Sequence, residues 1–326
     1  MTPTDAFDGA CRLDNWGLIR ASGPDAASFL HGQLTTDVVH LGPAQARLAG
    51  YCSPKGRLLA SFVMWRDEAG DILLACSADL LPATLRRLRM FVLRARCVLS
   101  DASAEVSLYG LVGPRALAWL GATSPGAPWT KRDGDGDRVG VTAIALPDAA
   151  GCARVLCAST IAPDLPPLAP AAWAWLEVRS GIARIEAATL EKFVPQMLNY
   201  ELLGGVDFQK GCYPGQEIVA RSQYRGSIKR RSLLFETDGA AQPGDEVFHS
   251  DDASQPAGMV VNAAPQPQES TPGSLALVEV KLASLDGGSL HLRAVDGPDL
   301  RRAAPPYALP VEPAPATDVT AQPPPT

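Results

Sequence analysis

An apolar stretch followed by a Gly-Pro turn and a helical stretch occurs twice in this order, and it limits the fold more than any other feature. The first copy occupies residues 18–30 with Gly23-Pro24, and the second occupies residues 108–120 with Gly113-Pro114. Proline suits a helix start because its φ is already helical and its missing N–H has no partner there. Such strand-then-helix units pack helices on a sheet, so the repeat predicts an α+β fold.

The pattern of the chain changes after residue 231. Short apolar stretches separated by turns follow at 232–235, 246–249, 258–262, 275–282 and 289–293. This spacing predicts a small β-barrel or sandwich at the C-terminal end. Upstream, the pattern predicts strands at 58–65 and 72–76, helices at 80–93 and 173–185, a surface loop at 123–137 and a linker at 162–170.

The net charge and the distribution of apolar residues argue against a nucleic-acid-binding, secreted or membrane protein. The chain has 29 Lys and Arg against 35 Asp and Glu, a net charge of −6. Since phosphate neutralisation dominates affinity for nucleic acids, we do not expect direct RNA binding. The N-terminal stretch lacks the features of a secretory signal, and no apolar run approaches the roughly 18 residues of a membrane span. We therefore expect a cytoplasmic protein without a membrane partner.

The cysteines and histidines do not form a recognisable metal or disulfide pattern. The 7 cysteines are scattered and include no Cys-x-x-Cys pair, and the 4 histidines are dispersed. We therefore expect neither a disulfide framework nor a metal site of familiar spacing.

One cysteine lies in a dense local pattern of chemically informative residues. Cys212 is two residues from Lys210 and is followed by a Pro-Gly turn, after which residues 216–221 are expected to form a helix. A neighbouring cation or a helix N-terminus stabilises a thiolate, which is the reactive form of cysteine. The pattern favours a reactive Cys212 with Lys210 as its cation, although most cysteines in such proteins are small buried apolar residues.

This stretch also resembles the signature of a known family. The matching residues are Lys210, Gly211, Cys212, Tyr213, Gly215, Gln216 and Glu217, followed by Ile-Val-Ala-Arg at 218–221. They resemble the motif of the YgfZ family of folate-binding proteins, which are linked to iron–sulfur cluster maintenance and are relatives of the glycine-cleavage T-protein, an aminomethyltransferase. Further similar stretches at 15–16, 23–26, 32–38, 52–57, 193–196, 203–206 and 306–307 extend the resemblance from about Leu13 to about Tyr307.

The resemblance implies a fold and a division into units. It implies a T-protein-like folate-binding core of ferredoxin-like or related α/β units, followed by a C-terminal β-barrel. The expected units are the first part of the folate-binding core at 10–100, a second α/β unit at 101–170, a return to the core at 171–231 and the barrel at 232–310. The proline-rich residues 311–326 are predicted to be a disordered tail.

The same resemblance implies a ligand and a cellular role. It implies tetrahydrofolate or a derivative as the bound ligand, with Trp16 and Trp175 lining the pterin pocket. Basic residues at 86–96 and 221–231 could meet the folate carboxylates, and the sequence does not choose among them. The implied role is an accessory protein for iron–sulfur cluster assembly or repair and, through it, for tRNA methylthiolation. Its partners would be iron–sulfur enzymes such as radical tRNA-thiolating enzymes, contacted indirectly or transiently.

Two other functions stay open at this point. One is a folate-dependent aminomethyl transferase. The T-protein relatives use an aspartate near the pterin, but the expected spacing falls near Ala83, whereas the available carboxylate is Asp79. This departure favours a role without aminomethyl transfer. The other is a binding module in which Cys212 is only structural.

Overall fold

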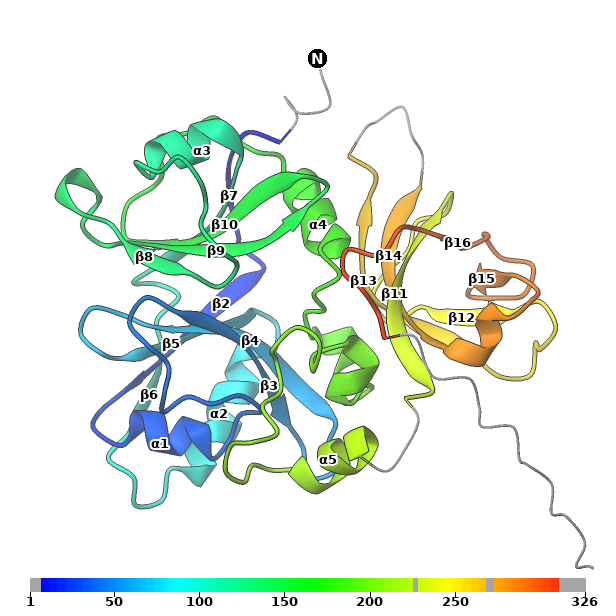
Figure 1. The fold of residues 1–326 in the computed structure, drawn as a ribbon, viewed down its shortest axis with the longest axis horizontal. Coiled ribbons are helices and arrows are strands. Elements are labelled where there is room, and N and C mark those ends of the chain that lie inside the picture. The colour runs from blue at the N-terminus through cyan, green and yellow to red at the C-terminus, as the bar shows by residue number, and fades with distance from the viewer. Residues whose placement is uncertain (1–6, 225–227, 268–272, 311–326) are drawn as a thin grey trace, which may run out of the picture.

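The structure is a computed structural model and describes residues 7–224, 228–267 and 273–310, so the predicted tail at 311–326 lies outside the described residues. Three antiparallel sheets form the framework (Figure 1). Two of them lie one above the other, and the third stands beside both. The helices are few and short.

The first sheet has the strand order β3-β4-β5-β2-β6. Its strands are β2 (Trp16–Ser22), β3 (Ala46–Cys52), β4 (Leu58–Arg66), β5 (Ile72–Ser77) and β6 (Val98–Asp101). The helices α1 (Ala26–His31) and α2 (Leu81–Phe91) cover one face, where Leu30, Leu85 and Leu88 are buried against strand residues. The strands predicted at 58–65 and 72–76 and the helix predicted at 80–93 are confirmed.

The second sheet has the order β1-β7-β10-β9-β8. Its strands are β1 (Gly9–Arg12), β7 (Ser107–Val112), β8 (Lys131–Asp133), β9 (Val141–Ala149) and β10 (Cys152–Ser159), with the helix α3 (Gly113–Trp119) after β7. The predicted strand–Gly-Pro–helix unit thus occurs twice, as β2–α1 and as β7–α3. Residues 10–12, grouped with the first unit from sequence, pair with β7 here.

Two sequence-based assignments around the second sheet are wrong in part. The predicted loop at 123–137 contains β8, which pairs with β9 through Lys131 and Ile144 and continues into a 3-10 turn (Gly136–Arg138). The helix predicted at 173–185 is α4 (Pro170–Arg179), which begins earlier and ends earlier. Gly181 has φ +68°, a left-handed conformation that commonly ends helices, so the chain leaves the helix there.

The C-terminal sheet has the order β15-β12-β13-β14-β11-β16 and curves into a barrel-like shape (Figure 1). Its strands are β11 (Arg230–Thr237), β12 (Glu246–His249), β13 (Gly258–Pro265), β14 (Ser274–Lys281), β15 (Leu290–Leu292) and β16 (Arg301–Arg302). The helix α5 (Gln216–Tyr224) precedes it, and further 3-10 turns are Ala187–Thr189, Pro195–Leu198 and Leu282–Leu285.

The five strands predicted after residue 231 and the helix after Gly215 are therefore confirmed. An α+β fold with a C-terminal barrel-like sheet is confirmed as well. The predicted limits of the units stay a prediction.

Candidate functional site

A cavity of about 270 Å³ lies where the three sheets and α4 meet. Six of its polar lining residues are Trp16, Arg154, Glu177, Arg184, Glu186 and Asn262. Six of its apolar lining residues are Leu48, Phe62, Val63, Trp129, Leu146 and Ile182. A mostly apolar wall with a few placed polar groups is typical of small-molecule sites.

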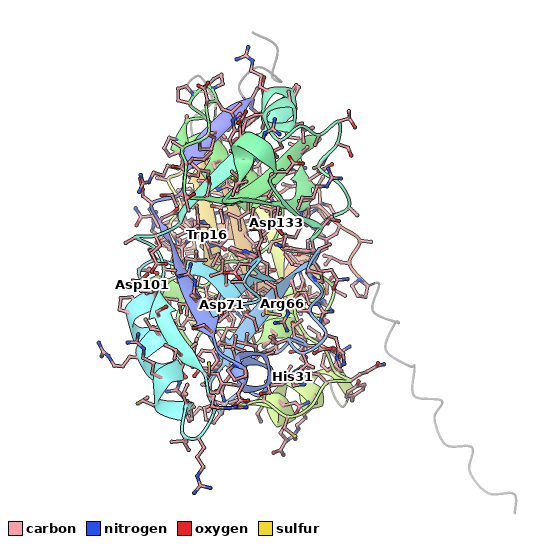
Figure 2. The ribbon with its side chains drawn as sticks, turned by 90° about the vertical axis from the view of Figure 1, so that its left-hand side faces the viewer. Trp16, His31, Arg66, Asp71, Asp101 and Asp133 are labelled. Atoms are coloured by element: carbon pink, nitrogen blue, oxygen red, sulfur yellow. The ribbon has the colours of Figure 1, made fainter. Side chains whose placement is uncertain are left out.

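Trp16, one of the two predicted ligand tryptophans, lines this cavity from the start of β2. Its indole Nε1 donates a hydrogen bond to Glu177 Oε1 at 3.2 Å. The guanidinium of Arg184 lies 5.0 Å from the centroid of the indole ring. These two contacts hold the ring in one orientation in the cavity wall. Figure 2 places Trp16 at the level where the second sheet meets the first.

Trp175, the other predicted tryptophan, is not among the residues that line the cavity. Its Nε1 donates to Gln266 Oε1 at 3.1 Å, and its ring stacks on Phe7 with centroids 5.7 Å apart. Trp175 therefore does not share the cavity lining with Trp16, although the neighbouring Ala174 and Glu177 of α4 do line the cavity. A ligand contact of Trp175 stays a prediction.

Glu186 is a half-buried carboxylate in the cavity that sequence reasoning missed. It accepts a hydrogen bond from Asn262 Nδ2 at 3.3 Å and forms an ion pair with Arg184 Nη2 at 3.0 Å. Burial raises the pKa of Glu186, and the charges of Asp79 and Glu177 raise it further, while Arg184 opposes them. Two charged residues, Arg184 and Glu186, within the apolar stretch 182–188 were the sequence signal for a polar site. The helix predicted at 173–185 made them look like ordinary residues at the surface and the end of a helix.

Asp79, the carboxylate compared with the aspartate of the T-protein relatives, lies outside the cavity lining. Asp79 is exposed, and its Oδ2 accepts a hydrogen bond from the backbone N–H of Ala187 at 2.9 Å. Ala83 is exposed on α2. Neither residue is among those that line the cavity. The described basic residues at 86–96, 221–224 and 228–231 also contribute no lining residue, whereas Arg154 and Arg184 do.

Cys212 lies in the loop before α5, outside the cavity lining. All seven cysteines belong to the described part of the chain, and among them Cys212 alone is exposed. Burial raises the pKa of the other six thiols, for Cys52, Cys76 and Cys157 to about 12. The exposed thiol of the motif is therefore the one that a partner can reach.

Lys210 fixes the motif loop to the end of α1. Its Nζ donates hydrogen bonds to the carbonyl oxygens of His31 and Leu34, the latter at 2.9 Å, and lies 4.9 Å from the ring centroid of Tyr213. Burial lowers the pKa of Lys210 to about 8, and the charges of Asp207, Asp37 and Cys212 oppose that shift. That Lys210 stabilises the thiolate of Cys212 stays a prediction.

Gly215 lets the motif loop pack closely against the backbone of Ser53 and Gly56. Gly215 has φ +80°, and a Cβ there would lie 2.4 Å from the carbonyl oxygen of Ser53. Behind it, Tyr213 is buried, whereas Gly211 and Glu217 are exposed and Gln216 begins α5. The motif thus forms a tight turn that packs its tyrosine inward and presents its cysteine outward.

The thiol loop and the cavity are separate places on the molecule. Lys210 binds the backbone of His31, which Figure 2 shows at the lower end of the first sheet, away from Trp16. A small ligand in the cavity would therefore not reach Cys212 directly in this conformation.

The replacement Lys210→Met is expected to slow alkylation of Cys212 by iodoacetamide about 3- to 10-fold at pH 7, because a nearby cation stabilises the thiolate by roughly 1 kcal/mol. Since the pKa of Lys210 is lowered to about 8, the wild-type advantage should vanish above roughly pH 9, where Lys210 is neutral. Mass spectrometry of the labelled peptide measures both rates. The exposed Lys55→Met is the matched control, and equal slowing at both pH values would show that Lys210 only shapes the loop.

Within residues 7–224, 228–267 and 273–310, no group of three or more His, Cys, Asp and Glu side chains is arranged to hold a metal ion. In the same residues, no helix has the length and apolar character needed to cross a membrane.

Comparison with known proteins identifies relatives. No family model matches the chain. The tRNA-modifying protein YgfZ of Edwardsiella ictaluri (strain 93-146) is 34 % identical over 249 residues, which cover 71 % of this chain and 71 % of that protein. YgfZ of Klebsiella pneumoniae (strain 342) is 32 % identical over 238 residues, 70 % of this chain and 71 % of that protein.

A solved structure supports the fold independently. The glycine cleavage system aminomethyltransferase T of Bartonella henselae superposes with a TM-score of 0.70 at 18 % identity, over 92 % of this chain and 87 % of that one. At this identity the likeness concerns the fold alone. With relatives above 30 % identity over more than two thirds of both chains, the protein belongs to the YgfZ family.

Proposed function

We propose that the protein binds a reduced folate, tetrahydrofolate or a derivative, in the cavity beside Trp16. The observation that carries this proposal is the pairing of an aromatic face, Trp16, with a half-buried carboxylate, Glu186, in one cavity. A reduced pterin has a flat pyrimidinone ring and a donor edge made of N3–H and the 2-amino group. A carboxylate accepts such a pair of parallel donors with both oxygens, and an indole provides a face for the ring.

The remaining polar groups of the cavity suit the same ligand. Asn262 and Arg184 hold Glu186 in place, and Asn262 also accepts from the Arg184 backbone N–H at 2.9 Å. A volume of about 270 Å³ is close to the lower end of ligand pockets, roughly 300 Å³. It suits the pterin portion better than a whole folate, so the tail would extend further along or out of the cavity.

The relatives and the exposed thiol support a proposal for the wider role. The relatives are named tRNA-modifying proteins. We infer that this chain supports tRNA modification as an accessory protein, by helping to assemble or repair the iron–sulfur clusters of enzymes such as radical tRNA-thiolating enzymes. These partners would meet Cys212 at the surface, indirectly or transiently. Folate would act at the separate cavity.

Aminomethyl transfer is the competing function. It gains no support from Asp79, whose carboxylate lies outside the cavity lining and binds the Ala187 backbone. Turnover of an aminomethyl donor with tetrahydrofolate by the purified protein would overturn the accessory role in favour of this alternative.

The replacement Trp16→Ala is expected to weaken tetrahydrofolate binding by about 1 to 3 kcal/mol, because the aromatic face of the pocket is lost. This corresponds to a roughly 5- to 150-fold higher Kd. Isothermal titration calorimetry is the suitable measurement, since it does not depend on tryptophan emission. Trp175→Ala and the double variant test the sequence-based prediction for the second tryptophan. Unchanged affinity in all three variants would refute folate binding at this place.

A further inference from the structure

We infer that Arg154 forms a carboxylate-binding subsite on the second-sheet side of the cavity. Arg154 lies on β10 (Cys152–Ser159), is 2 % exposed and is one of the cavity-lining residues. The inference deepens the proposed function, because it assumes that the cavity is the ligand site and adds the chemical class that its second end recognises.

The charge of Arg154 has no close counter-charge. Its Nε and Nη2 donate to the carbonyl oxygen of Pro147 at 3.2 and 3.0 Å, and its guanidinium lies 5.6 Å from the ring centroid of Trp173. Among the residues that the structure describes, no carboxylate oxygen lies within 4.0 Å of it. The neutral carbonyl of Pro147 and the ring face of Trp173 therefore take the place of the ion pair that a buried cation normally has.

The acidic groups whose charges act most on Arg154, Glu177 and Asp148, do not form an ion pair with it. Glu177 is the first of the charges that favour the cationic form of Arg154, but its carboxylate accepts the Trp16 indole N–H. Burial outweighs these charges and lowers the pKa of Arg154 to about 10. An uncompensated buried cation is unfavourable for folding, and such groups occur where a ligand completes their environment.

Nη1 of the Arg154 guanidinium determines which chemical group could bind there. Within the described residues, Nη1 of Arg154 has no hydrogen-bond acceptor, whereas Nε and Nη2 are both used by Pro147. A planar guanidinium in a cavity of low dielectric constant recognises a carboxylate strongly. Trp129, Leu146 and Val63 line the same cavity and belong to one apolar cluster. They favour a carboxylate that is attached to a flat apolar group.

Two sources provide that chemistry. One is the aminobenzoylglutamate portion of the folate itself, whose pterin would be held by Glu186 further along the cavity. The other is a separate aromatic carboxylic acid that binds beside the pterin. Both place a carboxylate on Arg154, and ligands with and without that group distinguish them.

The test is isothermal titration calorimetry of the full chain with tetrahydrofolate, 6-methyltetrahydropterin and 4-aminobenzoylglutamate. Arg154→Met is expected to weaken a carboxylate-bearing ligand at least tenfold and to leave 6-methyltetrahydropterin, which has no carboxylate, within twofold. Arg154→Lys keeps the charge but lacks the planar guanidinium, so its affinity for a carboxylate-bearing ligand should lie between those of the wild type and Arg154→Met. If the Met variant does not fold, the Lys variant carries the test with a loss of at least threefold. The exposed Arg132→Met is the matched control.

The outcomes separate the sources and the two proposals. A loss seen with tetrahydrofolate assigns the subsite to the folate tail. A loss seen only with 4-aminobenzoylglutamate added to tetrahydrofolate-saturated protein assigns it to a separate acid. Equal weakening of all three ligands, or no change in any, overturns the subsite. If the wild type binds no pterin, folate binding fails, and wild type against Arg154→Met with 4-aminobenzoylglutamate alone still decides the subsite.

Discussion

Replacing Glu186 with glutamine is expected to weaken tetrahydrofolate binding by about 2 to 4 kcal/mol, or roughly 30- to 900-fold. In the proposed complex the carboxylate accepts from the two N–H donors of the pterin edge through Oε2 and through Oε1, which is shared with Asn262 and Arg184. Glutamine keeps one acceptor and turns an NH₂ donor toward the other ligand donor, so a bond is lost and a buried donor is left unpaired. Glu186→Gln preserves the shape of the side chain, so the loss of affinity measures the contribution of the negative charge and of the second acceptor oxygen.

Calorimetric titration with tetrahydrofolate measures this effect. Glu105→Gln is the matched control, because Glu105 is exposed and pairs with Arg20 outside the cavity lining. A Kd that rises less than threefold in Glu186→Gln, with the melting temperature unchanged, would show that the pterin edge is recognised by other groups.

The same carboxylate predicts the pH dependence of binding. Burial raises the pKa of Glu186, so it takes up a proton at a higher pH than an exposed glutamate. The pterin edge needs the ionised carboxylate, and therefore the affinity should fall as the pH is lowered through mildly acidic values. In Glu186→Gln this dependence should disappear. An affinity that rises toward acidic pH would instead mean that protonated Glu186 donates to the ligand.

The elements that the sequence predicts well are those with a local cause. The two strand–Gly-Pro–helix units and the C-terminal strands depend on neighbouring residues, and all appear in the structure. The helix predicted at 173–185 begins earlier, at Pro170, and ends at Arg179, because Gly181 adopts φ +68° just after it. The loop of Lys210 and Gly215 was also predictable, since its turn residues are adjacent in the chain.

The cavity could not be predicted in the same way, because it is made by contacts between distant segments. Arg154, Glu186 and Asn262 come from the second sheet, the segment after α4 and the C-terminal sheet. No local pattern in the sequence indicates that these three parts of the chain meet. Trp16 was found through a family resemblance, but the orientation of Trp175 depends on how α4 packs, and that packing directs Trp175 to Gln266.

The replacement Cys212→Ala is expected to abolish function in cells while leaving the fold intact. Cys212 is exposed and in a loop, so removing its sulfur creates no cavity, and the melting temperature should change by less than about 2 °C. A strain that lacks the endogenous protein should not regain tRNA thiolation or iron–sulfur enzyme activity with this variant. Wild type on the same plasmid should restore both, since the proposed chemistry with the partner needs this thiol.

Selective labelling distinguishes a reactive thiol from a structural one. At pH 7.5 iodoacetamide should modify Cys212 before the other six cysteines, whose thiols are buried or half-buried with raised pKa values, and buried thiols with a pKa of about 12 are almost entirely protonated. Cys152→Ala removes a half-buried thiol on β10 and is the matched control, which should complement like wild type. If Cys212→Ala complements fully and Cys212 labels no faster than Cys11 or Cys52, the motif is a structural turn. Folate binding in the cavity would then have to support tRNA modification without a thiol, because no other cysteine in the described chain is exposed.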